Sequence, residues 1–99
     1  MPLTIIVTRD VEMRYRGFLT SVMLEIAPGV YVAPEMSAAV RTRVWNVMTE
    51  WWEALGRGSL TLVWRDTRAA GHLRIENLGE PPRTIVDADG VLLAKRKQD

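Results

Sequence analysis

The chain of 99 residues contains no cysteine, one histidine and only two lysines among its 13 basic residues. Without cysteine, the protein has no disulfide bonds, no zinc sites built on thiolates and no cysteine nucleophile. The single histidine, His72, has no partner at catalytic or metal-ligand spacing, so we assign it no role. A glycine-rich phosphate loop, a serine-centred elbow and a paired carboxylate motif are also missing. Common enzyme signatures therefore do not identify the function.

Long apolar runs are absent as well. No stretch approaches the roughly 18 apolar residues that span a membrane, and no secretion signal opens the chain. We therefore expect a cytoplasmic protein that is not inserted in a membrane. The composition is 47% hydrophobic and 25% charged, which is ordinary for a globular protein. The length predicts one domain over residues 1–99, with a core at about 3–80 and a C-terminal extension at about 83–95.

Apolar residues recur at helical spacing in two segments, which predicts two helices that each bury one side. The first stripe comprises Val11, Tyr15, Phe18, Leu19 and Val22, and the second comprises Val40, Val44, Val47, Met48, Trp51 and Leu55. Ser37 is a suitable N-cap for the second helix, and Gly56 suits the position after its last turn. Trp45 and Trp52 lie beside this second stripe, which indicates either a subunit contact or a broad core face.

Alternating apolar residues predict strands before, between and after the helices. They cover residues 3–8, 23–26, 30–32, 60–65, 72–76, 84–86 and 91–93. Ala27-Pro28-Gly29 joins the second and third into a tight hairpin, and Asp89-Gly90 joins the last two. This order predicts an α+β, ferredoxin-like βαββαβ fold with helices on one face of an antiparallel sheet, plus a short C-terminal hairpin.

Charged residues gather where the first predicted strand passes into the first predicted helix. Asp10 follows the strand, and its carboxylate could hold a hard cation such as Mg²⁺ or cap the helix; the residues alone favour the cap. Arg14 and Arg16 come next, and a guanidinium matches phosphate oxygens with a rigid fork of donors. Two residues apart, they lie about 200° apart on a helix and do not share a face. Their alternative role is that of solvated surface side chains.

Several segments, taken together, resemble the small adaptation protein of CRISPR systems, and most closely its type I-E branch. These segments occur in order over about residues 3–93, with spacing similar to that of the family. They are Val7–Val11 with Arg14–Gly17 and Leu19, Leu24–Val32, Ser37–Ala38 with Val40–Arg41 and Val44–Trp45, and Arg83–Thr84 with Val86–Asp87, Asp89–Gly90 and Leu92.

The resemblance implies a homodimer of ferredoxin-like protomers that takes part in spacer acquisition. In the type I-E branch, the dimer sits between two dimers of the CRISPR integrase subunit and supports the middle of a double-stranded DNA prespacer. Basic residues matching Arg14, Arg16 and Arg83 would contact the DNA backbone.

Members of the wider family are described as Mg-dependent endonucleases acting on RNA or DNA. In them, an acid at the end of the first strand holds the metal across the dimer axis. By this resemblance Asp10 would be both the catalytic and the metal-binding residue, although the nuclease role is dispensable in the type I-E branch. The acid expected in that branch falls on Arg9, with Asp10 one place later. Because neighbouring strand residues point to opposite faces, this shift argues against a catalytic metal site.

Three functions are therefore compatible with the sequence. The first is a non-catalytic scaffold that binds double-stranded DNA, and the second is a Mg-dependent nuclease centred on Asp10. The third is an RNA-binding module, which would stack bases on exposed aromatic side chains of its sheet. It ranks last because Trp64 shares a strand face with Leu60 and Leu62, the predicted core side.

Overall fold

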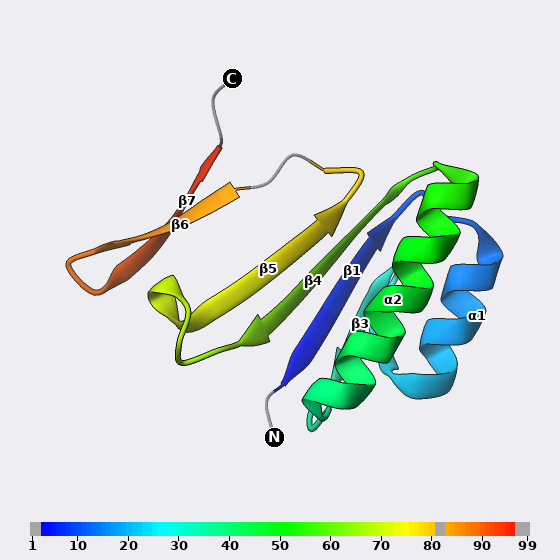
Figure 1. The fold of residues 1–99 in the computed structure, drawn as a ribbon, viewed down its shortest axis with the longest axis horizontal. Coiled ribbons are helices and arrows are strands. Elements are labelled where there is room, and N and C mark those ends of the chain that lie inside the picture. The colour runs from blue at the N-terminus through cyan, green and yellow to red at the C-terminus, as the bar shows by residue number, and fades with distance from the viewer. Residues whose placement is uncertain (1–2, 81–82, 97–99) are drawn as a thin grey trace.

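A computed structural model describes residues 3–80 and 83–96 (Figure 1). Its elements run in the order β1 (Thr4–Arg9), α1 (Met13–Val22), β2 (Leu24–Ala27), β3 (Val30–Ala33), α2 (Ala38–Leu55), β4 (Ser59–Arg65), η1 (Ala70–His72), β5 (Leu73–Leu78), β6 (Arg83–Ala88) and β7 (Val91–Arg96). The first five strands form one sheet, and β6 and β7 form a separate hairpin. The predicted α+β class and the C-terminal hairpin are confirmed.

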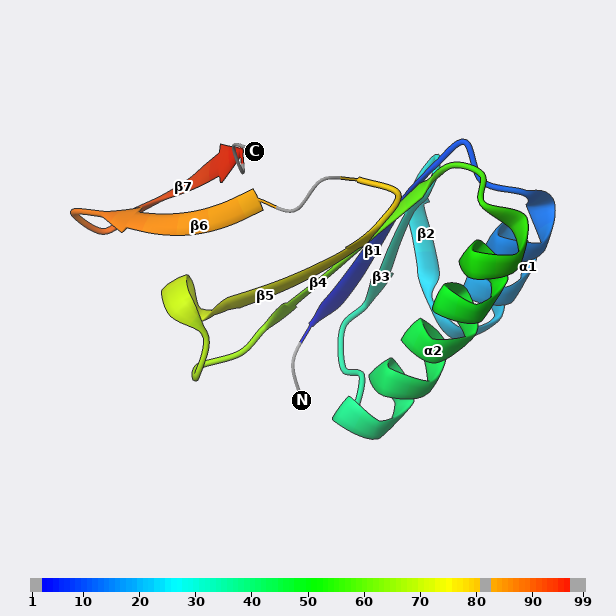
Figure 2. The same cartoon turned by 45° about the horizontal axis from the view of Figure 1, so that its top comes forward.

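Strand β1 lies at the centre of the five-stranded sheet, whose order is β2-β3-β1-β4-β5 with every pair antiparallel. Within it, Ile6 pairs with Tyr31 of β3 on one side and with Leu62 of β4 on the other. Residues directly opposite one another point to the same face, so these three side chains share one. Both helices cover a single face of the sheet (Figure 2). This is the predicted ferredoxin-like arrangement, extended by β5 at one edge.

The core lies between the helices and this covered face of the sheet. Its fully buried apolar side chains are Ile6, Tyr15, Leu19, Tyr31, Met48, Leu60 and Leu62. The two helices contribute the middle residues of their predicted stripes, and the strands contribute alternate residues, as the two periodicities require. Trp45 and Trp52 are partly buried and pack against this core, as expected for a broad core face.

The two helices differ in how well their ends follow the sequence signals. Helix α2 begins after Ser37, whose hydroxyl accepts a hydrogen bond from the Val40 N–H at 3.2 Å, and ends at Gly56 in the left-handed conformation. Helix α1 begins only at Met13, without a side-chain cap, so Val11 of the predicted stripe precedes it. Among the described residues, neither helix is both long and apolar enough to cross a membrane.

The opposite face of the sheet carries no helix and is rich in apolar side chains. Val7 is 37% exposed there, and Leu24, on the edge strand β2, is 61% exposed. Ile5, Val32 and Val63 share this face through the strand register. We call it the open face, and a contiguous exposed apolar surface of this kind typically marks an interaction site.

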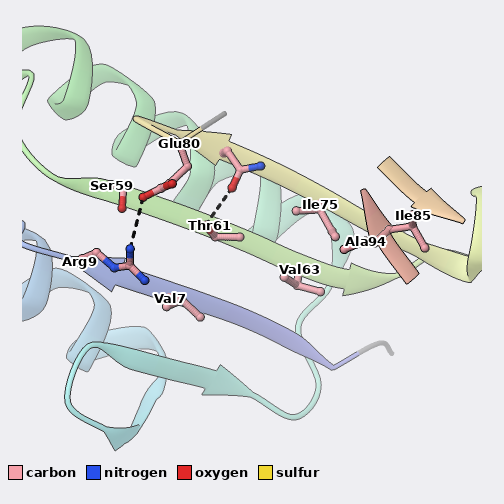
Figure 3. A pocket seen from close by; sticks show the side chains of 10 residues that line it. Val7, Arg9, Ser59, Thr61, Val63, Ile75, Glu80, Ile85 and Ala94 are labelled. Atoms are coloured by element: carbon pink, nitrogen blue, oxygen red, sulfur yellow. Dashed lines mark hydrogen bonds and ion pairs between the residues drawn. The ribbon is translucent and has the colours of Figure 1, made fainter. Parts of the chain in front are cut away.

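The C-terminal hairpin covers part of the open face. Ile85 of β6 and Ala94 of β7 line a cavity of about 280 Å³ together with Val7, Val63 and Ile75 of the sheet (Figure 3). The hairpin also packs against the turn η1, where the backbone of Gly71 lies close to the Ile85 and Leu92 side chains. Hairpin and sheet are thus joined by side-chain contacts, whereas backbone hydrogen bonds join strands within each sheet.

Truncation of Leu62 tests the position of the core. Leu62 is 1% exposed and lies on the central strand pair β1–β4, so Leu62→Ala removes buried apolar contacts and leaves a cavity. We expect the free energy of unfolding to fall by about 2–5 kcal/mol. Urea denaturation followed by circular dichroism measures this change. Leu3→Ala, at a residue 47% exposed, is the matched control and should change stability far less.

Candidate nucleic-acid interface

The predicted site lies at the end of β1, where the chain turns towards α1. An open hollow of about 350 Å³ there is lined by Arg9 and Asp10 on one side, by Arg16 of α1, and by Pro28 and Gly29 of the β2–β3 turn. The structure therefore brings Asp10 and Arg16 to one concave surface although they are six positions apart in the sequence. The hollow is open to solvent, and its charged lining residues are Arg9, Asp10 and Arg16.

Asp10 does not cap the helix, contrary to the interpretation that the residues alone favoured. Glu12 occupies the N-cap position, two residues later, and makes no side-chain cap hydrogen bond. Asp10 instead adopts a left-handed backbone conformation (φ 56°), and its Oδ1 accepts a hydrogen bond at 3.2 Å from Nη2 of Arg57. The pair is a surface ion pair, since the Asp10 side chain is 74% exposed. Arg57 lies in the loop between α2 and β4. The residues around Asp10 in the sequence therefore give no sign of this pairing.

The magnesium site predicted at Asp10 would need carboxylates from two protomers and stays a prediction, because one protomer by itself supplies few ligands there. Within the described residues, no group of three or more His, Asp or Glu side chains is arranged to hold a metal. The Asp10 carboxylate already faces the positive charge of Arg57, which a cation would have to displace against electrostatic repulsion. Hard cations also prefer several oxygen ligands, and Asp10 supplies one side chain.

Arg14 lies on the side of α1 that faces α2. Its guanidinium carbon is 4.5 Å from the centroid of the Trp51 ring, within the range of a cation–π contact. Trp51 in turn makes edge-to-face contacts with Tyr15 and Phe18 at centroid distances of 5.5 and 5.6 Å. The arginine is exposed, and the Trp51 ring contacts its guanidinium group directly.

Arg16 points to the other side of α1, towards the β2–β3 hairpin, so the prediction that the two arginines do not share a face is confirmed. Its Nη2 lies 3.3 Å from Oε2 of Glu25, and its side chain is 46% exposed. The same Glu25 oxygen accepts the Gly29 N–H at 3.0 Å. The Gly29 N–H, assisted by the charge of Arg16, lowers the pKa of Glu25 below its ordinary value. Glu25 thus pairs with one nitrogen of the Arg16 guanidinium, while the side chain as a whole stays partly exposed to solvent.

Arg83 begins strand β6, where its backbone pairs with that of Arg96. Its side chain lies outside the described part of the structure, so its predicted contact with DNA stays a prediction.

Sequence reasoning missed the partners that hold these charged groups. Arg57 is 47 positions from Asp10, and Trp51 is 37 positions from Arg14, so only the tertiary fold brings them together. A further contact of this kind places the guanidinium carbon of Arg41 4.2 Å from the Trp64 ring centroid. Trp64 therefore lies on the helix-covered face, as its alternation with Leu60 and Leu62 predicted. Among the described residues, the open face carries no aromatic side chain for base stacking.

Fold and surface together define a small ferredoxin-like α+β protein with exposed arginines beside an open apolar sheet. A family model described as "CRISPR-associated protein (Cas_Cas2CT1978)" matches residues 3–93. The match covers nearly the whole chain, and the chain belongs to this Cas2-like family of CRISPR-associated proteins.

Glu25→Gln tests the two contacts of the Glu25 carboxylate, with the Gly29 N–H and with Arg16. A lowered pKa means that Glu25 stays ionised to lower pH in the folded protein than in the unfolded chain. Its stabilising contribution is therefore complete above the ordinary pKa of 4.5 and is lost as the pH falls below that value. We expect the variant to show a shallower fall in the free energy of unfolding between about pH 5 and pH 3.

Urea denaturation at a series of pH values measures this slope. Glu50→Gln removes the same charge from an exposed position on α2 and is the matched control. An unchanged pH dependence in Glu25→Gln would show that the Glu25 carboxylate makes neither of these contacts in solution.

Proposed function

We propose that this protein is a homodimeric scaffold that binds double-stranded DNA during CRISPR spacer acquisition, in complex with an integrase subunit. The observation that carries the proposal is the pair of exposed, partly anchored arginines on α1, Arg14 and Arg16, in a chain of this family. Membership of the family supports the adaptation role, and the arrangement of charge supports the mode of binding.

The expected ligand is the phosphate backbone of a duplex. Arg14 and Arg16 are each restrained on one side, by Trp51 and by Glu25, which lowers the entropy lost when their remaining donors meet phosphate oxygens. Contacts of this type neutralise phosphates and release counterions, so they give affinity without sequence specificity. A scaffold that accepts prespacers of many sequences requires this property.

The open face is the proposed dimer interface. Val7 and Leu24 are exposed on it, and the C-terminal hairpin covers only part of it. Association of two such faces would remove apolar surface from water, which is the main favourable term in protein association. The interface is also distinct from the arginine-bearing helix α1, which packs on the other side of the sheet (Figure 2). A dimer formed in this way would leave the arginines of both protomers outside the interface (Figure 2).

Removal of the proposed phosphate contacts tests the scaffold function. Arg14→Ala, Arg16→Ala and Arg83→Ala should each weaken binding to a blunt duplex, because each deletes one cation facing a phosphate. We expect each variant to reduce the slope of log affinity against log salt by about one. Fluorescence anisotropy with a labelled duplex, over a range of salt concentrations, measures both quantities.

Arg68→Ala is the matched control, since Arg68 is exposed in the loop beyond the far end of β4. It should leave the salt slope unchanged. Addition of Mg²⁺ should leave the duplex intact on a denaturing gel, as expected for a protein that holds DNA. Unchanged binding in all three arginine variants, or cleavage that depends on Asp10, would contradict the proposal.

A charge on the open face tests the dimer. Val7→Asp places a carboxylate in the middle of the proposed interface, where its desolvation is unfavourable, so the dimer should dissociate to monomers. Light scattering coupled to size-exclusion chromatography measures the mass, and circular dichroism verifies that the fold is retained. Met13→Asp introduces the same charge at a residue 76% exposed at the start of α1 and should leave the mass unchanged. A monomeric wild-type protein would refute the interface.

A further inference from the structure

The ion pair between Asp10 and Arg57 is enforced by the backbone around it. Strands β1 and β4 pair up to Arg9 and Ser59, so the residues just beyond this pair come from two loops that meet at one end of the sheet. Gly58 packs so closely there that a Cβ would overlap the carbonyl oxygens of Arg9 and Asp10. The register of the sheet thus places Asp10 and Arg57 side by side.

Arg57 is presented by a short loop that is fixed at both ends. On one side Gly56 closes α2, and its N–H donates to the Trp52 carbonyl at 2.7 Å. On the other side the Trp52 indole N–H donates to the Gly58 carbonyl at 3.0 Å. The Arg57 side chain is 57% exposed, so this rigid loop offers a guanidinium to the solvent with Asp10 as its partner.

The pair borders the surface that the proposed function assigns to DNA. Asp10 and Arg16 line the same hollow, so a phosphate that reaches Arg16 approaches the Asp10 carboxylate as well. Two negative groups repel each other, while Arg57 is held by the carboxylate and contributes little net charge. Because exposed ion pairs contribute little to stability, the pair can be opened without disturbing the fold.

Resting on the proposed function, we propose that Asp10 restrains an additional phosphate-binding residue, Arg57, and so limits the affinity for DNA. Asp10 acts as a positioning residue through its ion pair rather than as a metal ligand. Arg57 is the group that meets the phosphate when the pair opens. The role assigned to the strand-end carboxylate is thus opposite to that of a nuclease, because loss of its charge strengthens the interaction with nucleic acid.

Asp10→Asn tests the inference, since asparagine tolerates the left-handed backbone and the side chain is exposed. We expect tighter binding to a duplex and a salt slope steeper by about 0.9, as one more phosphate is neutralised. The gain in affinity should be about threefold larger at 50 mM than at 200 mM salt. Fluorescence anisotropy in EDTA and in Mg²⁺, at matched ionic strength, should give the same gain.

Two variants separate release of Arg57 from simple loss of a negative charge. In Asp10→Asn combined with Arg57→Ala, the salt slope should equal that of Arg57→Ala alone, because the cation that Asp10→Asn would release is gone. Asp66→Asn removes a carboxylate paired with Arg74 at 3.3 Å near the other end of β4, and it should not steepen the slope.

The outcomes distinguish this inference from the function on which it rests. Absence of duplex binding by the wild-type protein would overturn both. Binding by the wild type, with no gain or an unchanged salt slope in Asp10→Asn, would overturn only the role of Arg57. Weaker binding of Asp10→Asn confined to Mg²⁺ buffer would show that Asp10 is a metal ligand and would also refute the inference.

Discussion

Burial of one face of the five-stranded sheet beneath α1 and α2 is the constraint on which the rest of the molecule depends. The central pairing of Ile6 with Tyr31 and Leu62 places a continuous apolar layer under the helices. A chain of this length has two helices, enough to cover one face only. The apolar residues of the other face are consequently left to the C-terminal hairpin and to solvent.

The same arrangement determines where charge can collect. Because the helix-covered face of the sheet is packed with apolar side chains, charged side chains lie around it, in loops, on helix flanks, at strand ends and on the edge strands. Near the end of β1 two ion pairs join residues of different elements, Asp10 with Arg57 at 3.2 Å and Arg16 with Glu25 at 3.3 Å. These pairs orient guanidinium groups without burying them. Such exposed pairs can open at small cost to the fold, because surface ion pairs contribute little to stability.

Most of the fold followed from local patterns in the sequence. The ends of α2 were predicted because Ser37 and Gly56 carry their signals in their own chemistry. The last hairpin was predicted because Asp89 and Gly90 both accept the positive φ angles that a tight turn requires, 54° and 86°. The start of α1 was placed too early, since its first turn has no side-chain cap to mark it. The capping role expected for Asp10 was wrong, because the local sequence is the same whether an aspartate before a helix bonds to the helix N-terminus or to a distant residue. Here it bonds to Arg57.

The sequence by itself determined the order of the elements, the face that each would bury and the family to which the chain belongs. Those properties are local or periodic, and each depends on residues close together in the chain. Only the tertiary structure decided which charges meet: Arg57 reaches Asp10 from 47 positions away, and Trp51 lies under Arg14. Such contacts depend on strand register and helix packing, which arise from the whole core at once. The chemistry of the strand end was therefore set by the fold and not by the residues that adjoin it in sequence.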